Sequence, residues 1–413
     1  MTLPTHRWAL TDRMTEALRR ISACRELLDE YLADTEPWHG AIRKQVMASV
    51  VHYSTKIEGN RLTREQVEAV IAGEVIEAPE KDKTEAVNYL RAMEWARTRA
   101  DDPGWHLSHD TLTTLHFLVG QNLGTDYEPL GKYREHQNTV SDRATGQVIY
   151  WPPRPEDLRS VLDEFVEWAR SLSDADTDPY IANALVHLIF VAIHPFSDGN
   201  GRVARTLCSL LMMREGHKAQ AFYSLEEYFG VNWEAYGKQI ERALGPRWKP
   251  AAVDCTPWIE WYLEAIAVQV AQAAHHIARI MAEIGVMALQ MYAAGDAISP
   301  KTLIALWLAR RDGQITNRTY RNAVDVQSKT ASQHLQRLVH AGYLTQIGQR
   351  RGAHYVLGEK TKDWKFDRLV DIWLDKGRDG VAEEIFGVPA PQSETLFSLG
   401  APADSGFEGE GGI

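Results

Sequence analysis

Cysteine is scarce in this sequence, and long apolar runs are missing from it. The 413 residues include three cysteines, Cys24, Cys208 and Cys255, and no two of them have the C-x-x-C spacing. This argues against a disulfide framework and against a zinc site, so buried or inert thiols are expected. No apolar run approaches the roughly 20 residues that a membrane span requires. Residues 1–14 contain no basic segment followed by an apolar one, so we expect a cytoplasmic chain that neither crosses a membrane nor is secreted.

The chain also lacks a basic excess, because its formal charge at pH 7 is −11. This argues against a protein whose whole surface coats nucleic acid. The average conceals an asymmetry. Residues 297–358 contain nine Lys or Arg against two Asp, a charge of +7, and the rest of the chain carries −18. The length suggests two to four domains at roughly 100–200 residues each. Because the positive charge is confined to residues 297–358, we expect a basic module joined to an acidic body.

The spacing of apolar residues predicts a mainly helical chain. Early in the chain they recur at three- and four-residue steps, at Ile42, Val46, Val50, Tyr53 and Ile57. This helix is predicted to end at Gly59-Asn60, so that the following loop begins near Glu58. Further helices are predicted at residues 84–99, 108–119 and 257–289. Residues 181–193 are apolar on every side, which indicates a buried central helix.

Two stretches break the helical pattern. Residues 138–151 carry β-branched and aromatic residues on both sides of a Thr145-Gly146 turn and lead into prolines, which predicts a short hairpin. The last 26 residues, from Val388, contain five Gly, three Pro, four acidic residues and no Lys or Arg. Such a composition predicts a disordered tail.

The most informative stretch is HPFSDGNGRVAR at residues 194–205, between two predicted helices. Gly199 to Gly201 allow the backbone a positive φ and a close approach to a ligand. The helix that begins near Arg202 directs its free N–H groups at this loop, which predicts a site for an anion. Arg202 and Arg205, three residues apart on the first turn, add donors suited to a polyphosphate.

Two further side chains supply chemistry at this loop. Asp198 offers a hard oxygen ligand for Mg²⁺. His194, whose unperturbed pKa would lie near about 6.5, is placed to act as a general base that takes the proton from an attacking hydroxyl. A single histidine at a helix end is more often structural, and D-G-N-G occurs in many ordinary turns. The prediction therefore depends on the combination.

Residues 194–205 match H-x-F-x-[D/E]-G-N-G-R-x-x-R at every fixed position, and the chain thereby resembles the Fic family. The resemblance implies a mainly α fold, a Fic-type helical bundle with a β-hairpin flap. It also implies a protein adenylyltransferase that uses ATP as substrate with Mg²⁺, transfers AMP to a hydroxyl of a target protein and releases pyrophosphate. The unknown target would present a Ser, Thr or Tyr hydroxyl, and self-modification near the flap is one expectation.

The resemblance also assigns roles within the loop. His194 would deprotonate the target hydroxyl, and Asp198 would hold the Mg²⁺ that bridges the α- and β-phosphates. Arg202 would contact the β-phosphate side and Arg205 the γ-phosphate. The remaining phosphate contacts would come from the side chain of Asn200 and the backbone amides of the loop, so that the nucleotide set also contains Gly199, Asn200 and Gly201.

The resemblance extends beyond the loop. The hairpin at residues 138–151 looks like the family's flap, which holds a target segment extended through backbone hydrogen bonds, and residues 131–134 resemble the approach to it. Residues 232–240 look like the helix that often carries two adjacent tyrosines near the adenosine. Here the pair is Tyr236 and Gly237. Tyr236 is thus the expected ATP-binding residue, and the missing second tyrosine leaves a base other than adenine open.

Upstream, Ser54, Glu58 and Gly59 match the family's inhibitory pattern [S/T]-x-x-x-E-[G/N]. Taken alone, this short pattern would fit a helix C-terminus with Glu58 solvated and Gly59 as its cap. In a chain that resembles Fic proteins it implies that Glu58 pairs with Arg205, by a bidentate contact that competes with the γ-phosphate. We therefore predict an autoinhibited enzyme. In some relatives the equivalent glutamate also helps to remove AMP, which leaves a bifunctional enzyme open.

The basic segment resembles a winged helix-turn-helix domain. Helices are predicted at residues 300–310, at about 318–324 and from Ser328, the expected N-cap, to Ala341, followed by two short strands around residues 349–352. Two groups of residues would contact DNA, one in the major groove and one on the phosphates: Lys329, Thr330, Ser332, Gln333 and Arg337, and then Arg350 and Arg351. Winged helices also bind proteins or dimerise, so the partner stays open, and a homodimer is expected by analogy.

The predicted domains are an N-terminal helical region with the inhibitory helix at 1–104, a Fic catalytic core at 105–245, a helical connector at 246–296, a winged helix at 297–360, a helical segment at 361–387 and a disordered tail at 388–413. Besides the autoinhibited adenylyltransferase, two functions stay open. One is a nucleotide-sensing, DNA-binding transcriptional regulator. The other is a Fic enzyme that transfers another phosphate-linked group, such as UMP or phosphocholine. Phosphoryl transfer, as in the death-on-curing branch, fits less well because that branch departs from the G-N-G-R that this chain keeps.

Overall fold

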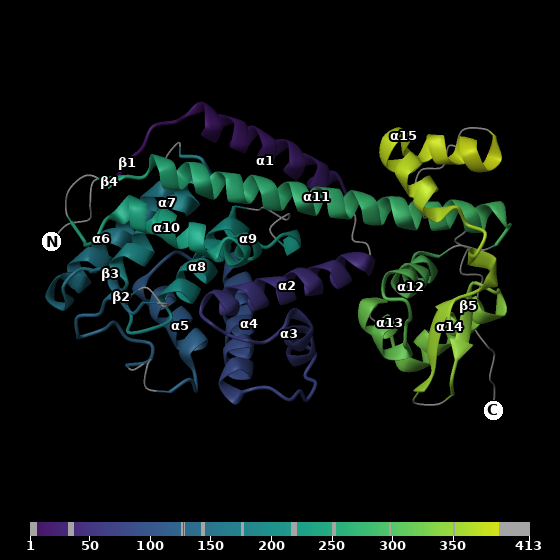
Figure 1. The fold of residues 1–413 in the computed structure, drawn as a ribbon, viewed down its shortest axis with the longest axis horizontal. Coiled ribbons are helices and arrows are strands. Elements are labelled where there is room, and N and C mark those ends of the chain that lie inside the picture. Colours follow the sequence, from purple (N-terminus) through teal and green to yellow (C-terminus); the bar gives the residue numbers. More distant parts are fainter. Residues whose placement is uncertain are drawn as a thin grey trace. The chain divides into compact units, whose positions relative to one another are not determined.

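The structure of the protein is a computed structural model. It describes residues 6–31, 37–124, 127, 129–141, 145–174, 177–215, 221–249, 253–296, 299–324, 326–349 and 352–387. The predicted tail at 388–413 and the predicted wing residues Arg350 and Arg351 lie outside these ranges. The chain divides into two compact units, one of residues 1–29 and 43–273 and the other of residues 30–42 and 274–413 (Figure 1).

The first unit is mainly helical, as predicted. Its helices are α1 (Asp12–Tyr31), α2 (Pro37–Ile57), α3 (Arg64–Ile71), α4 (Glu80–Ala100), α5 (His109–Gly120), α6 (Pro155–Asp174), α7 (Pro179–Ile193), α8 (Asn200–Arg214), α9 (Leu225–Val231), α10 (Trp233–Leu244) and the first part of α11 (Thr256–Ala293). Helices α1, α2 and α11 cross the division between the units. Strand β1 (His6–Arg7) pairs in parallel with β4 (Val253–Asp254), and β2 (Val140–Ser141) pairs antiparallel with β3 (Val148–Tyr150).

Helix α7 is buried on all sides, which confirms the prediction for residues 181–193. Asp178 caps its N-terminus by accepting a hydrogen bond from the backbone N–H of Tyr180, and Pro179 at the first helical position has the backbone angle that a helix start needs. The helix packs against α6 and α8, and α8 also packs against α4 and α5. Each fully buried large apolar side chain in this core contributes roughly 1.5–3 kcal/mol. The loop between α7 and α8 is thus held between two buried helices.

The second unit contains the basic segment. After the last part of α11 come α12 (Pro300–Arg311), α13 (Asn317–Val324), α14 (Ser328–His340), the antiparallel strands β5 (Leu344–Ile347) and β6 (His354–Leu357), the short 3-10 helix η4 (Glu359–Thr361) and α15 (Phe366–Phe386). An isolated bridge joins Ile315 to Tyr355, which adds a third extended segment beside the hairpin. Helix α15 bends at Gly377, whose φ of 70° and ψ of −169° are not helical. Three helices followed by a hairpin is the element order expected from the sequence.

One local prediction in this unit is wrong. Gln327, rather than Ser328, is the residue that precedes the first turn of α14, and it makes no side-chain capping bond. The hydroxyl of Ser328 instead donates to Oδ1 of Asn317 at the start of α13, while Nδ2 of Asn317 donates to Oγ of Ser332. The Ser328 hydroxyl, which the sequence predicted to cap α14, therefore links α14 to α13 instead.

Each helix in the described part of the chain is too short or too polar to cross a membrane.

Candidate active site

The loop between α7 and α8 is bounded by two residues in the left-handed region. His194 ends α7 with φ 49° and ψ 59°, and Gly199 precedes α8 with φ 77°. A histidine in this region is strained, which is a feature of functional sites. A Cβ on Gly199 would lie 3.0 Å from the ring of Tyr127, so this position also needs glycine for space. The predicted positive φ is thus present at Gly199. Gly201, by contrast, lies within α8 and has no positive φ.

His194 is half-buried, and its ring is held in one tautomer. Nδ1 lies 3.2 Å from the carbonyl oxygen of Val191, which can only accept, so Nδ1 carries the proton and Nε2 keeps a lone pair. Burial, together with the positive charge of Arg134, lowers the pKa of His194 to about 4. The imidazole is therefore neutral at pH 7 and able to accept a proton.

The backbone of His194 is fastened to the segment before the hairpin. Nε of the buried Arg134 donates to the carbonyl oxygen of His194 at 3.0 Å, and the backbone N–H of Arg134 donates to the carbonyl of Pro195. Nη2 of Arg134 donates to the carbonyl of Pro153 at 2.6 Å, beyond the hairpin. Arg134 therefore ties both ends of the predicted flap to the loop that presents the histidine.

The side chain of Asn200 is bonded to the backbone of the loop. This side chain is buried, its Oδ1 accepts from the backbone N–H of Phe196 and its Nδ2 donates to the carbonyl oxygen of Phe196, both at 2.9 Å. Both polar groups of the side chain are thus bonded to the loop itself. Asn200 therefore shapes the loop, and its role toward phosphates stays a prediction.

Asp198 is the acidic residue of the loop. Its Oδ1 accepts from the backbone N–H of Gly199 at 2.5 Å and lies 4.0 Å from Nη2 of Arg202, and its side chain is 44% exposed. Among the described residues, no group of three or more His, Cys, Asp or Glu side chains could hold a metal ion. Mg²⁺ is commonly held by one or two carboxylates together with substrate phosphates and water. A single accessible carboxylate beside an anion site therefore fits a Mg²⁺ ion that is shared with a nucleotide.

Arg205 is almost completely buried and is bonded to the end of α2. Its Nε donates to Oγ of Ser54 at 2.8 Å, and its Nη2 donates both to the carbonyl oxygen of Ser54 and to Oε1 of Glu58, each at 2.9 Å. Burial alone would lower the pKa of Arg205, but the charge of Glu58, the hydrogen bond from Arg205 to Glu58 and two nearby tyrosines together outweigh burial, so the pKa is raised. The expected contact between Glu58 and Arg205 is present. It is not bidentate, because Ser54 takes the Nε donor.

The carboxylate of Glu58 lies against residues 199–201, which we call the anion loop because the sequence predicts an anion site there. Helix α2 ends at Ile57, so Glu58 is the first residue after it, as the sequence pattern predicts. A Cβ added to Gly201 would lie 2.5 Å from Oε1 of Glu58 and 3.0 Å from Nη1 of Arg205. Glycine at position 201 therefore makes room for this ion pair, which explains the second glycine of the motif without a positive φ.

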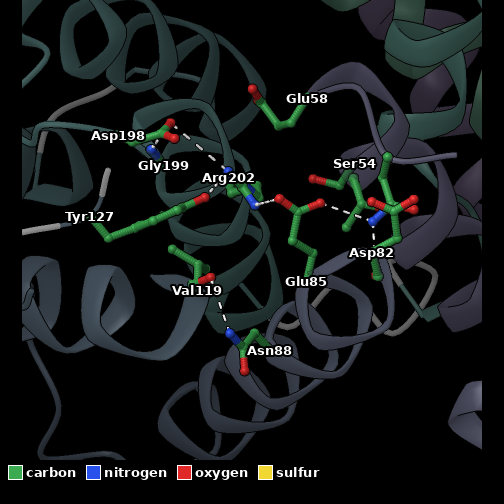
Figure 2. Close-up of polar contacts among 12 residues, drawn as sticks. Ser54, Glu58, Asp82, Glu85, Asn88, Val119, Tyr127, Asp198, Gly199 and Arg202 are labelled. Atoms are coloured by element: carbon green, nitrogen blue, oxygen red, sulfur yellow. Dashed lines mark hydrogen bonds and ion pairs between the residues drawn. The ribbon is translucent and has the colours of Figure 1, made fainter. Parts of the chain in front are cut away.

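Arg202 is held by two residues that the sequence analysis did not identify. Its Nη2 donates a short hydrogen bond to the hydroxyl of Tyr127, and its guanidinium lies over the Tyr127 ring, 5.4 Å from the centroid. Its Nη1 lies 3.4 Å from Oε1 of Glu85 on α4, and both of these side chains are buried (Figure 2). No local pattern marks Tyr127 or Glu85, because they come from other elements than the motif.

Tyr236 lies in a buried aromatic cluster. Its hydroxyl is 3.0 Å from Nε2 of His187, and its ring stacks on Phe229 with centroids 4.6 Å apart. Burial lowers the pKa of His187 to about 3, with a further contribution from Arg205. The cluster thus contains a neutral histidine and lies next to the motif arginine. Gly237 has open space around its missing Cβ.

The hairpin of β2 and β3 is extended by one more pairing. Trp151, which follows β3, forms a β-bridge with Arg247. The backbone N–H of Trp248 donates to the carbonyl oxygen of Trp151 at 2.7 Å. The Trp151 side chain is 47% exposed, and the Val148 side chain on β3 is also exposed. The predicted hairpin is present, with its base fixed by the chain that follows α10.

The residues predicted to contact DNA lie in the second unit. Lys329, Gln333 and Arg337 are exposed on α14, as is Ser332, and Thr330 is half-buried. The spacing of the first three places them on one face of the helix. Arg350 and Arg351 are outside the described residues.

Part of this chain is similar to known proteins. Residues 106–212 match the Fic/DOC family and form a Fic/DOC domain. The chain is 31% identical over 206 residues to the protein adenylyltransferase Fic of Nematostella vectensis, across 49% of this chain and 45% of the relative. It is 31% identical over 169 residues to the protein adenylyltransferase fic-1 of Caenorhabditis briggsae, across 40% of this chain and 32% of the relative. The matched part spans less than half the length of either relative.

Two crystal structures share the fold. One is a Fic family protein from Desulfovibrio desulfuricans, with a TM-score of 0.57 and 19% identity, over 85% of this chain and 97% of that one. The other is a Fic domain-containing signalling protein from Bacteroides thetaiotaomicron, with a TM-score of 0.51 and 21% identity, over 64% of this chain and 98% of that one. At these identities the likeness concerns the fold alone.

Proposed function

We propose that this protein is an adenylyltransferase that transfers AMP from ATP to a Ser, Thr or Tyr hydroxyl of a protein. The observation that carries the proposal is the neutral His194 at the mouth of a loop that presents Asp198, backbone amides and two buried arginines. Two curated relatives, each 31% identical to part of this chain, are named protein adenylyltransferases. AMP transfer would use each of these groups, because it needs a base, a metal ligand and donors for phosphates.

The reaction follows from the positions of the groups. The hydroxyl oxygen of the target forms a bond to the α-phosphorus, and the bond from that phosphorus to the oxygen bridging to the β-phosphate breaks, so pyrophosphate leaves. Nε2 of His194 receives the hydroxyl proton, since Nδ1 is already protonated. Arg202 and Arg205 supply fixed positive charge for the β- and γ-phosphates. Asp198 would hold the Mg²⁺ ion, which supplies charge neutralisation on the phosphates.

We also propose that the enzyme is autoinhibited. Glu58 takes a donor of Arg205 that a γ-phosphate would otherwise use, and its carboxylate lies against Gly201 of the anion loop. Two anions at one arginine repel each other, so ATP has to displace Glu58 or bind unproductively. Helix α2 would then be the inhibitory helix of the chain.

The test is incubation of the full chain with Mg²⁺ and each of the four nucleoside triphosphates, followed by intact-mass measurement of the chain and of proteins in a host lysate. Glu58→Gly is expected to gain the mass of AMP minus water, on itself or on a target, with ATP only. His194→Ala in the same background is expected to gain nothing. Transfer of a different nucleotide would support another Fic chemistry, and no adduct with any nucleotide would contradict the proposal.

A second candidate function concerns the second unit, which contains the basic segment at residues 297–358. Its three helices and hairpin support a winged helix, and α14 exposes Lys329, Gln333 and Arg337 on one face. Of the two acidic residues in residues 297–358, Asp312 is paired with Arg311. A face of this charge suits the phosphates and major groove of duplex DNA. We propose that this unit binds DNA and that the transferase acts at the site where it is bound.

A further inference from the structure

The two motif arginines are each paired with a carboxylate, and one residue outside the motif links the two pairs. Arg205 is paired with Glu58, and Arg202 lies 3.4 Å from Glu85 on α4. The other oxygen of Glu85, Oε2, accepts a hydrogen bond from Nδ2 of Asn60 at 2.9 Å. Asn60 follows Glu58 by two residues. Figure 2 shows the Glu85 carboxylate between Arg202 on one side and Ser54 of α2 and Asp82 of α4 on the other.

Both polar groups of the Asn60 side chain make hydrogen bonds that hold the segment after α2. Asn60 is buried, its Nδ2 also donates to the carbonyl oxygen of Asp82 at 2.9 Å, and its Oδ1 accepts from the backbone N–H of Leu62 at 3.0 Å. Its own backbone N–H donates to the carbonyl of Thr55 in the last turn of α2. These bonds fix the short segment that carries Glu58 to the start of α4. Glu85 therefore helps to hold, through Asn60, the segment from which Glu58 contacts Arg205.

Two nitrogens of Arg202 make no hydrogen bond to any residue in the described part of the chain. The guanidinium is buried, and its Nε and Nη1 have no hydrogen-bond partner among the residues that the structure describes, although Nη1 is within ion-pair distance of Glu85. A buried donor without a partner is costly, and such groups are expected to meet an anion when the site is used. Without a bound anion, the negative charge of Glu85 balances the positive charge of Arg202.

We propose that Glu85 is a positioning residue that couples the two arginines: it orients Arg202 for the nucleotide and, through Asn60, holds Glu58 on Arg205. The proposal rests on the proposed function, because it assumes that the arginines bind phosphate. It predicts two separable effects. Loss of the Asn60 to Glu85 bond frees Glu58 and strengthens ATP binding, whereas loss of the Glu85 charge leaves Arg202 poorly oriented and weakens it.

Two variants separate these effects. Asn60→Asp keeps the acceptor for Leu62 but removes the donor and places a carboxylate beside Glu85, so it breaks the fastening. Glu85→Gln keeps the shape and an acceptor for Asn60 but removes the charge beside Arg202. Asn88→Asp is the matched control, since Asn88 is a buried asparagine of α4 whose Nδ2 donates to the carbonyl of Gln121 at 2.6 Å and contacts neither arginine.

The first measurement is amide hydrogen exchange by mass spectrometry in the full chain without nucleotide. Asn60→Asp is expected to accelerate exchange in residues 55–62 by about tenfold or more, and Asn88→Asp is expected to leave that segment unchanged. Equal acceleration by the two variants, or none by Asn60→Asp, would overturn the proposed fastening. This readout does not depend on any activity.

The second measurement is the Kd of ATP with Mg²⁺ by titration calorimetry. Asn60→Asp is expected to tighten binding about tenfold when Glu58 is present and to change nothing in the Glu58→Gly background. Glu85→Gln is expected to weaken binding about tenfold in the Glu58→Gly background, where Asn60→Asp has no effect. An equal effect of Asn60→Asp in both backgrounds, or no effect of Glu85→Gln, would overturn the coupling. If Glu58→Gly itself binds no ATP, the proposed function fails, and the exchange data still decide whether Asn60 holds the segment.

Discussion

Oε1 of Glu58 accepts a hydrogen bond from Nη2 of Arg205 at 2.9 Å, although the two residues are 147 positions apart. Glu58 comes from the loop after α2 and Arg205 from the second turn of α8. The arginine is 2% exposed and the glutamate 18%. The pair therefore neutralises a buried charge at an arginine that we propose binds phosphate, so the stability of the chain and the proposed autoinhibition depend on the same contact.

Removal of this carboxylate is expected to weaken the fold while it opens the site. Glu58→Gly leaves Arg205 buried without its counter-charge, so the free energy of unfolding should fall by about 3 kcal/mol in urea titrations. Saturating ATP with Mg²⁺ should restore much of this loss, because a ligand that binds only the folded state stabilises it. Glu77→Gly, at an exposed loop position, is the control. Equal stability of Glu58→Gly and wild type without nucleotide would argue against a counter-charge role.

The pH dependence of transfer is expected to lack the usual histidine inflection. Burial lowers the pKa of His194 to about 4, so the neutral base persists well below the ordinary value near about 6.5. In the Glu58→Gly background, kcat/KM should stay flat from pH 8 to pH 5.5. A halving of kcat/KM near pH 6.5 would show that the free enzyme's base titrates normally.

Acid is expected to destabilise the fold through its buried histidines. Burial lowers the pKa of His116 to about 4, so between this value and about 6.5 the unfolded chain binds a proton that the folded chain does not. Stability therefore falls as the pH drops through this window. For His116 the loss between pH 7 and pH 5 is on the order of 2 kcal/mol.

A variant isolates this contribution. Nδ1 of His116 accepts from the backbone N–H of Gly131 at 3.0 Å, and the ring stacks on Phe196 with centroids 4.0 Å apart. His116→Asn keeps an acceptor but cannot titrate, so the difference in unfolding free energy between pH 7 and pH 5 should shrink by about that amount. His340→Asn, at an exposed position on α14, is the control. An unchanged difference in His116→Asn would mean that His116 does not contribute.

Two glycines are expected to respond to alanine in opposite directions. Gly199 has φ 77° and its Cβ would meet the Tyr127 ring at 3.0 Å, so Gly199→Ala should lower the free energy of unfolding by about 1–3 kcal/mol. Gly237 is helical with open space around it, so Gly237→Ala should raise it by about 0.5–1 kcal/mol. Thermal or urea unfolding checks both. A loss of stability in Gly237→Ala would show that the position has an unrecognised packing role.

Binding of DNA by the second unit is expected to depend on salt and on α14. Lys329→Ala with Arg337→Ala should weaken binding of a duplex by tenfold or more and reduce the slope of log K against log salt by about two. Lys362→Ala, a lysine paired with Glu359 outside α14, is the matched control. Fluorescence anisotropy with a labelled duplex measures all three. Absence of binding by wild type at low salt would remove this candidate function.

Local order along the chain was sufficient to predict most of the secondary structure and the loop that carries the motif. The helix ending before Glu58, the buried α7 and the hairpin depend on periodicity, turn residues and caps, which act over a few residues. The contact between Glu58 and Arg205 was expected only through the resemblance to a known family. Nothing in the spacing of 147 residues would have indicated it.

The tertiary structure decided the partners of the motif. Asn200 turned inward to Phe196, Ser54 took the Nε of Arg205, and Ser328 bonded to α13 instead of capping α14. Glu85 and Tyr127 meet Arg202 only because α4 and the loop after α5 pack beside α8. A buried polar group takes whichever partner the packing of distant elements brings within bonding distance. That choice has no local signature, so the sequence predicts which groups do chemistry here and the fold determines what holds them.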